Sequence, residues 1–183
     1  SRADTISEEE ISWMSKAGCD TILMGIESGS EKILKTINKN ITLKQIENAV
    51  SLCKKYNIRC RASFIIGLPG SYSEQLKSIK LMEKIMPENI NIHILAIYPG
   101  SEIYEKRKKY GIKIKNIKNW QDYNTYYSLK LFKIINFDYL TKKQAVTLCN
   151  TFIKRLKEKG YSQKRRNIIY KKGEKTVKTF LDF

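Results

Sequence analysis

The feature of this sequence that most constrains its fold is a strand–turn–helix pattern that occurs three times. Apolar runs at residues 21–24, 63–66 and 92–97 each end at a glycine-containing turn, and a helical pattern follows each turn. Short connections of this kind predict right-handed crossovers and a parallel sheet. The carboxyl ends of parallel strands meet at one edge of the sheet, where ligands bind. We therefore expect an α/β protein with a ligand site at that edge.

Capping signals mark where the helices begin. Ser7 is followed three residues later by Glu10, and Thr42 by Gln45, and each pair forms a capping box ahead of an apolar helical pattern. Thr141 begins a further amphipathic helix. We also expect a strand over residues 1–5, a last parallel strand over residues 91–98, and a short strand over residues 167–170.

Composition excludes several classes of protein. The four cysteines have no paired spacing, which favours free thiols over a disulfide scaffold, and the single histidine argues against a zinc site. His93 itself lies in an apolar run and is expected to be a core residue. The first residues lack the apolar run of a signal peptide and no apolar run is long enough to span a membrane, so we expect a cytoplasmic protein without a signal peptide or a transmembrane segment.

Positive charge is concentrated in the second part of the chain. Residues 1–103 carry 13 Lys and Arg against 12 Asp and Glu, whereas residues 104–183 carry 22 against 6. A step of this kind marks a change of module or a surface that meets an anion. We predict one domain over residues 1–110 and a basic, aromatic-rich extension over residues 111–183.

Two interpretations of the extension remain open. Its cations alternate with aromatic residues, as in proteins that bind RNA or anionic lipid, but a lysine-rich solvated face gives the same pattern. The candidate polyanion-binding residues are Arg107, Lys108, Lys109, Arg155, Arg165 and Arg166.

The first glycine turn contains the most informative single residue, Glu27. This carboxylate ends an apolar strand and is followed by Ser-Gly-Ser at the start of a helix. It can accept hydrogen bonds from a ligand's hydroxyl or ammonium groups, or it can bond neighbouring backbone N–H groups as a structural carboxylate. Gly67-Leu68-Pro69-Gly70, likewise, is either a close approach of backbone to a ligand or a plain rigid turn.

Together, the three motifs resemble the radical S-adenosylmethionine (SAM) superfamily. They read MGIESGS, FIIGLPGSY and LAIYPGS, in this order and at this spacing. Within the superfamily they are most similar to the cobalamin-associated branch that includes enzymes like the anaerobic Mg-protoporphyrin cyclase. The resemblance implies a partial (β/α) barrel, with about four of the family's six strands in residues 1–110 and a mainly helical extension after them. It also implies the cofactors SAM, a four-iron–four-sulfur cluster and, in that branch, cobalamin.

The resemblance also assigns residues to the cofactor. Glu27 and Ser28 would face the ribose and methionine part of SAM. The backbone of Ile66, Gly67 and Leu68 and that of Ala96, Ile97 and Tyr98 would line the adenine side. Where family members often have Glu-Thr after the Gly-Leu-Pro-Gly turn, this sequence has Ser71-Tyr72.

One family motif is absent. Iron–sulfur clusters of this family are held by cysteines in a C-x-x-x-C-x-x-C loop, and no cysteines here have that spacing. We therefore expect the carboxyl-terminal part of such a barrel without its cluster-binding half, inactive by itself and holding no metal. With that half, it would form a 5′-deoxyadenosyl radical or transfer a methyl group, acting on a small-molecule or lipid substrate that the sequence does not name. No catalytic residue can be assigned. The alternative is a cluster-free module that binds RNA or another polyanion through its basic tail.

Overall fold

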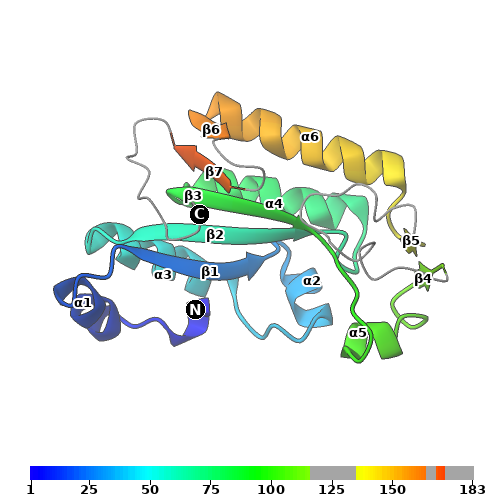
Figure 1. The fold of residues 1–183 in the computed structure, drawn as a ribbon, viewed down its shortest axis with the longest axis horizontal. Coiled ribbons are helices and arrows are strands. Elements are labelled where there is room, and N and C mark those ends of the chain that lie inside the picture. The colour runs from blue at the N-terminus through cyan, green and yellow to red at the C-terminus, as the bar shows by residue number, and fades with distance from the viewer. Residues whose placement is uncertain (116–134, 164–167, 172–183) are drawn as a thin grey trace, which may run out of the picture.

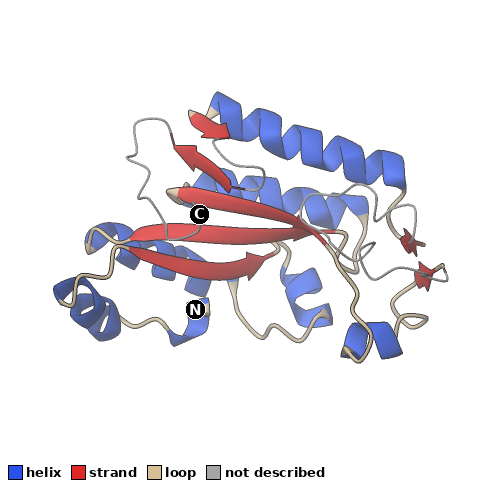
Figure 2. Ribbon diagram, in the orientation of Figure 1, coloured by secondary structure: helices blue, strands red, loops and turns tan. Residues whose placement is uncertain are grey.

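The computed structural model describes residues 1–115, 135–163 and 168–171 of the chain. Its centre is a sheet in which three neighbouring strands are parallel: β1 (Thr21–Glu27), β2 (Arg59–Ile66) and β3 (Asn89–Ile94). Two antiparallel strands, β7 (Ile168–Lys171) and β6 (Tyr161–Gln163), extend this sheet beyond β3. The predicted α/β class with parallel strands is confirmed (Figures 1 and 2).

The helices begin where the capping signals place them. Capping boxes are present at α1 (Glu8–Lys16), α3 (Leu43–Lys55) and α6 (Lys142–Glu158). The side chains of Ser30 and Ser71 cap α2 (Glu31–Thr36) and α4 (Tyr72–Ile85). Each cap satisfies a backbone N–H that the first helical turn leaves without a partner, which is why these boundaries can be read locally.

One face of the sheet is covered by helices and forms the core. Along β2, Cys60, Ala62, Phe64 and Ile66 are buried, and the residues between them are half-buried. The Phe64 ring lies 5.4 Å from that of Phe152 on α6, so this helix packs on the same face as α3 and α4. The opposite face, which has no helix of the parallel units on it, carries the alternate residues of the strands.

The predicted strand at residues 1–5 is wrong. Ala3–Thr5 forms a short 3₁₀ helix, η1, because local side-chain bonds hold the chain in a turn. The Arg2 guanidinium donates to Asp4 at 3.0 and 2.9 Å, and the Thr5 hydroxyl donates to the Arg2 carbonyl. The described sheet consequently has three parallel strands rather than the four expected, with β1 at its edge.

Strand β3 also differs from its predicted range. It begins at Asn89, two residues early, and ends at Ile94 rather than at residue 98. The Leu95 amide still donates to the Ile66 carbonyl at 2.8 Å, after which the chain leaves the sheet. The helix expected after Ser101 is the short α5 (Glu102–Glu105), followed by turns.

The residues after 111 share the core of the residues before them. β7 pairs with β3, α6 packs against α4 and β2, and the buried Tyr161 hydroxyl donates to the Pro87 carbonyl at 2.5 Å. β4 (Ile112–Ile114) and β5 (Ile135–Phe137) form a separate two-stranded sheet. The predicted boundary near residue 110 stays a prediction, although described elements on its two sides pack together.

No helix in the described part of the chain is long and apolar enough to cross a membrane.

Candidate functional site

The carboxyl ends of β1, β2 and β3 point in one direction in Figure 1, toward the side that carries α2, α5 and the β4–β5 pair. The segment after each parallel strand therefore lies at this edge. α1 lies at the opposite end. The expectation that the three glycine turns meet at one edge of the sheet is confirmed by this arrangement.

Glu27 lies at this edge and is paired with a lysine. Its Oε1 accepts a hydrogen bond from Nζ of Lys39 at 2.7 Å, and the two side chains are only 19% and 15% exposed. Lys39 comes from the loop between α2 and α3, twelve residues further along the chain. The pair presents an acceptor and a donor of opposite charge side by side in a partly shielded position.

The backbone at Glu27 is in an unusual conformation. Its φ is +65°, in the left-handed region that non-glycine residues rarely adopt. The ladder between β1 and β2 also shifts register between Gly25 and Glu27. Such a residue costs about 1–3 kcal/mol and persists where the surrounding structure requires it. The Glu27 carboxylate lies over Gly25, two residues back on the same strand.

Gly25 makes room for this ion pair. A Cβ at Gly25 would lie 2.4 Å from the Glu27 Oε1 and 2.9 Å from the Lys39 Nζ. The first glycine of the MGIESGS motif is therefore required by the position of the carboxylate. The second glycine, Gly29, serves packing, because a Cβ there would lie 2.4 Å from the Lys77 carbonyl oxygen on α4.

The face of the sheet that no described helix covers, called here the uncovered face, continues from Glu27 toward the amino ends of the strands. Strand register places Ser63 of β2 beside Gly25 and Asn91, and Ile65 beside His93. Burial lowers the pKa of His93, and the negative charge of Glu27 partly opposes that shift. His93 is thus half-buried on this face rather than in the helix-covered core.

Some residues assigned by the resemblance are buried and bonded within the protein. Ser28 is 1% exposed, and its hydroxyl accepts from the Ser30 amide. The Gly67 amide donates to Gln75 Oε1 at 2.7 Å, and its carbonyl accepts from the Tyr139 hydroxyl at 2.9 Å. Burial raises the pKa of this hydroxyl above its usual range.

The remaining residues that the resemblance assigns to SAM are partly buried and partly accessible. Ile66, Leu68 and Ile97 are at most 3% exposed. Ala96 is half-buried, and Tyr98 is 51% exposed. The groups that a ligand could reach are therefore Glu27, Ala96 and Tyr98, to which the structure adds Lys39, Ser63 and His93.

The predicted polyanion-binding residues that the structure describes do not form one patch. Arg107 to Lys109 follow α5, and Arg155 lies near the end of α6, which is at the other end of the molecule in Figure 1. Arg155 is bonded to Glu158 at 3.3 Å, and Arg107 lies over the Tyr104 ring. Arg165 and Arg166 lie outside the described residues.

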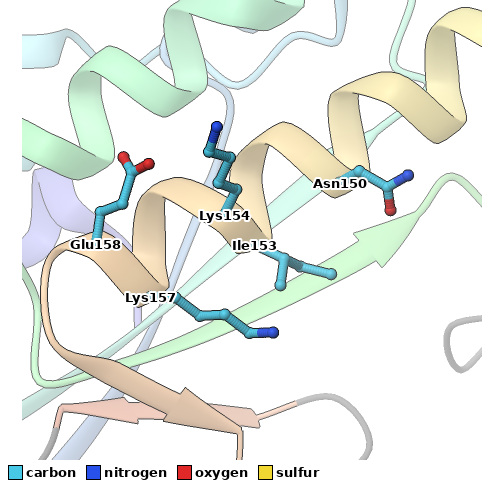
Figure 3. Close-up of a pocket in the computed structure, with 5 residues that line it drawn as sticks. All are labelled: Asn150, Ile153, Lys154, Lys157 and Glu158. Carbon is cyan, nitrogen blue, oxygen red and sulfur yellow. The ribbon is translucent and has the colours of Figure 1, made fainter.

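A shallow cavity of about 460 Å³ lies beside α6. It is lined by Asn150, Ile153, Lys154, Lys157 and Glu158. Figure 3 shows the Lys154 and Lys157 side chains leaving the helix in different directions, so they do not converge on one anion.

No metal centre is formed by the described residues, in which no group of three or more His, Cys, Asp or Glu side chains comes together. Cys53, Cys60 and Cys149 are buried and Cys19 is half-buried, and all four thiols are free. Their positions do not fit the ligand set of an iron–sulfur cluster.

A parallel sheet with helices on one face is the arrangement of a partial (β/α) barrel, and the Glu27–Lys39 ion pair lies at the carboxyl ends of its strands, where proteins of this class bind ligands. The model of the radical SAM superfamily matches residues 1–83, and the chain belongs to this superfamily.

Individual proteins agree with this assignment. The chain is 34% identical over 126 residues to an uncharacterized methyltransferase of Pyrococcus horikoshii, covering 68% of this chain and 27% of that protein. It is 29% identical over 112 residues to the tRNA uridine(34) acetyltransferase of Methanocaldococcus infernus, covering 59% and 21%. Among solved structures, coproporphyrinogen III oxidase (HemN) of Escherichia coli, described as a radical SAM enzyme, matches 94% of this chain and 34% of that one. The TM-score is 0.70 at 14% identity.

The chain thus spans about a quarter of the length of these curated relatives. The family implies SAM and an iron–sulfur cluster as cofactors.

Proposed function

We propose that this chain supplies the SAM-binding side of a radical SAM enzyme, with the cluster ligands contributed by residues outside it. The observation that carries the proposal is the Glu27–Lys39 ion pair at the carboxyl ends of the parallel strands. The methionine part of SAM carries an ammonium group and a carboxylate on one carbon. An acceptor and a donor 2.7 Å apart complement these two charges.

In this proposal Glu27 accepts from the ammonium group and Lys39 donates to the carboxylate. Ala96 and Tyr98, which follow β3, lie where the adenine side is expected from the resemblance. Ser28 and Gly67 do not contact SAM in this proposal, because their polar groups are bonded within the protein. They hold the two turns in place. When bound beside a reduced cluster, SAM supplies a 5′-deoxyadenosyl radical or a methyl group. The described cysteines do not fit that cluster, so no step is derived through it.

Ligand analogues can test the two charges separately. SAM, decarboxylated SAM and methylthioadenosine share the adenosine part and differ in the carboxylate and the ammonium group. We expect Lys39→Met to weaken SAM binding about tenfold, or ~1.4 kcal/mol, and to leave decarboxylated SAM unaffected. Glu27→Gln should weaken both, and neither variant should change binding of methylthioadenosine.

The control variant is Lys55→Met. Lys55 also pairs with a glutamate, Glu8, but this pair lies on the exposed surface of α1 and α3. Equilibrium dialysis with the three ligands gives the affinities. Equal losses for SAM and decarboxylated SAM in Lys39→Met would contradict the assigned role of Lys39. Unchanged SAM binding in both site variants would contradict the proposal as a whole.

An RNA substrate is the second candidate, and it is favoured by one relative, a tRNA-modifying enzyme by its name. Exposed Lys108 and Lys109 are available for phosphate contacts in the described part of the chain. Binding of tRNA through such contacts should weaken steeply with added salt. If Lys108→Gln/Lys109→Gln binds tRNA as tightly as the unaltered chain, these residues are not the contact.

A further inference from the structure

Among the residues that the structure describes, three side chains on the uncovered face of the sheet have buried polar atoms without a hydrogen-bond partner. They are Nε of Arg61 and the Oδ1 atoms of Asn89 and Asn91. Most buried polar groups in native proteins are bonded, so each exception requires an explanation. Here all three exceptions occur within one small part of one face.

Strand register brings these side chains together. Arg61 of β2 is opposite Asn89 of β3, and Ser63, two residues along β2, is opposite Asn91. Paired residues of neighbouring parallel strands point to the same face, and residues two apart on a strand do so as well. The three side chains therefore occupy adjacent positions on the face that also carries Ser63 and His93.

The positive charge of Arg61 and the burial of Asn89 both favour a bound ligand at this cluster. Arg61 makes no ion pair with any residue in the described parts of the chain. Asn89 is only 2% exposed. Arg59, two residues away on the same strand, has the acidic partner that Arg61 lacks among the described residues. Its guanidinium donates to Asp20 at 2.6 Å. Arg61 thus retains a donor, and the asparagines retain acceptors, that no residue in the described part of the chain uses.

The cluster lies deeper in the face than the proposed cofactor site. Arg61 is two residues from Ser63 and five from Ile66, the last residue of β2, which places it about 16–17 Å along the strand from its carboxyl end. Leu23, opposite Arg61 on β1, is 52% exposed, so this row is open at the sheet edge. A molecule lying against SAM at the carboxyl end could reach this row.

We infer that Arg61, Asn89 and Asn91 form a substrate subsite that binds the carboxylate of an organic acid bearing a hydroxyl or amino group beside it. The guanidinium fork matches a carboxylate in geometry and charge. The two asparagine oxygens accept the neighbouring O–H or N–H of the same molecule. This inference rests on the proposed function, because it makes the uncovered face the place where the substrate meets SAM.

The test uses thermal unfolding of the full chain with sodium salts of L-malate, succinate and phosphate. L-Malate has a hydroxyl beside a carboxylate, succinate lacks it, and phosphate is an anion of another class. Because a ligand that binds only the folded state raises the unfolding temperature, we expect L-malate to raise it most at matched ionic strength. The variants are Arg61→Met and Arg61→Lys, with Arg59→Met as the matched control on the same strand and face.

Arg61→Met removes an unpartnered buried donor, so we expect its unfolding temperature without ligand to rise by about 2–4 °C. It should also lose the response to L-malate. Arg61→Lys keeps the charge without the fork and should respond more weakly. Arg59→Met loses a bonded partner and should keep the full response.

Three results would overturn the inference. They are an unaltered chain that does not respond to L-malate, an Arg61→Met variant that responds fully, and a response to phosphate as large as that to L-malate. SAM binding is measured on the same samples and should be unchanged in Arg61→Met. If SAM binds but L-malate does not, the subsite alone is refuted; if SAM does not bind the unaltered chain, the proposed function is.

Discussion

Replacing Gly25 by alanine should weaken SAM binding and leave the stability of the fold almost unchanged. The new Cβ would lie 2.4 Å from the Glu27 carboxylate, which must move by about 1 Å to reach ordinary contact. The atoms it meets are the ends of two flexible side chains, so the backbone need not move. Gly25 is not among the glycines with a left-handed backbone, and alanine can adopt its conformation.

The expected stability change is small because two effects oppose each other. Alanine restricts the unfolded chain and stabilises by about 0.4–1 kcal/mol, while displacing the partly shielded ion pair, whose two charges both remain, costs about 1 kcal/mol. For a chain of this size the unfolding temperature should change by less than about 4 °C. SAM binding should weaken at least about tenfold, since Glu27 and Lys39 no longer meet in the same geometry.

Gly29→Ala is the matched comparison. Its Cβ would lie 2.4 Å from the Lys77 carbonyl oxygen and 2.8 Å from the Ser78 Cα, and both are backbone atoms. Overpacking of this kind costs about 1–3 kcal/mol, or about 2–12 °C in unfolding temperature. Circular dichroism melts and equilibrium dialysis with SAM distinguish the two variants. The reasoning is refuted if Gly25→Ala binds SAM normally, or if it loses as much stability as Gly29→Ala.

Two further predictions concern titratable groups. Burial lowers the pKa of His93, so the unfolded state binds a proton first as the pH falls; the free energy of unfolding should decrease below about pH 6.5. This decrease should be smaller in His93→Gln, measured by urea unfolding across a pH series, and equal decreases in both proteins would contradict it. Among the thiols, half-buried Cys19 should react with iodoacetamide in the native protein, whereas Cys149 is buried and its pKa is raised to about 11. Mass spectrometry follows the labelling, and equal rates at these two cysteines would argue against this account.

Local signals predicted the helices and turns because the interactions that form them are local. Ser7 with Glu10 and Thr42 with Gln45 lie three residues apart, and their capping boxes are present as expected. The pattern at residues 1–5 failed because five residues are too few to distinguish a strand from a turn held by Arg2 and Asp4. The pairing of β7 with β3 depends on residues about eighty positions apart, and no local pattern specifies it.

The site was predictable only where it touches a glycine turn. Glu27 was found because it precedes Ser-Gly-Ser, and its partner Lys39 was missed because it lies in a loop of ordinary composition. Arg61 and Asn91 each lie between two buried apolar residues of their strands. Only the register between β2 and β3 shows that they share a face. A sequence signal did exist, since polar residues at every second position of an apolar strand mark a face that is not in the core.

The most direct test of the central claim is a titration of the ¹⁵N-labelled chain with SAM, followed by amide chemical shifts. We predict that the shifted amides cluster at the carboxyl ends of the parallel strands, at Glu27, Lys39 and Ala96, with those of Lys154 and Lys157 on α6 unchanged. Shifts confined to α6, or no shifts at all at saturating SAM, would contradict the account.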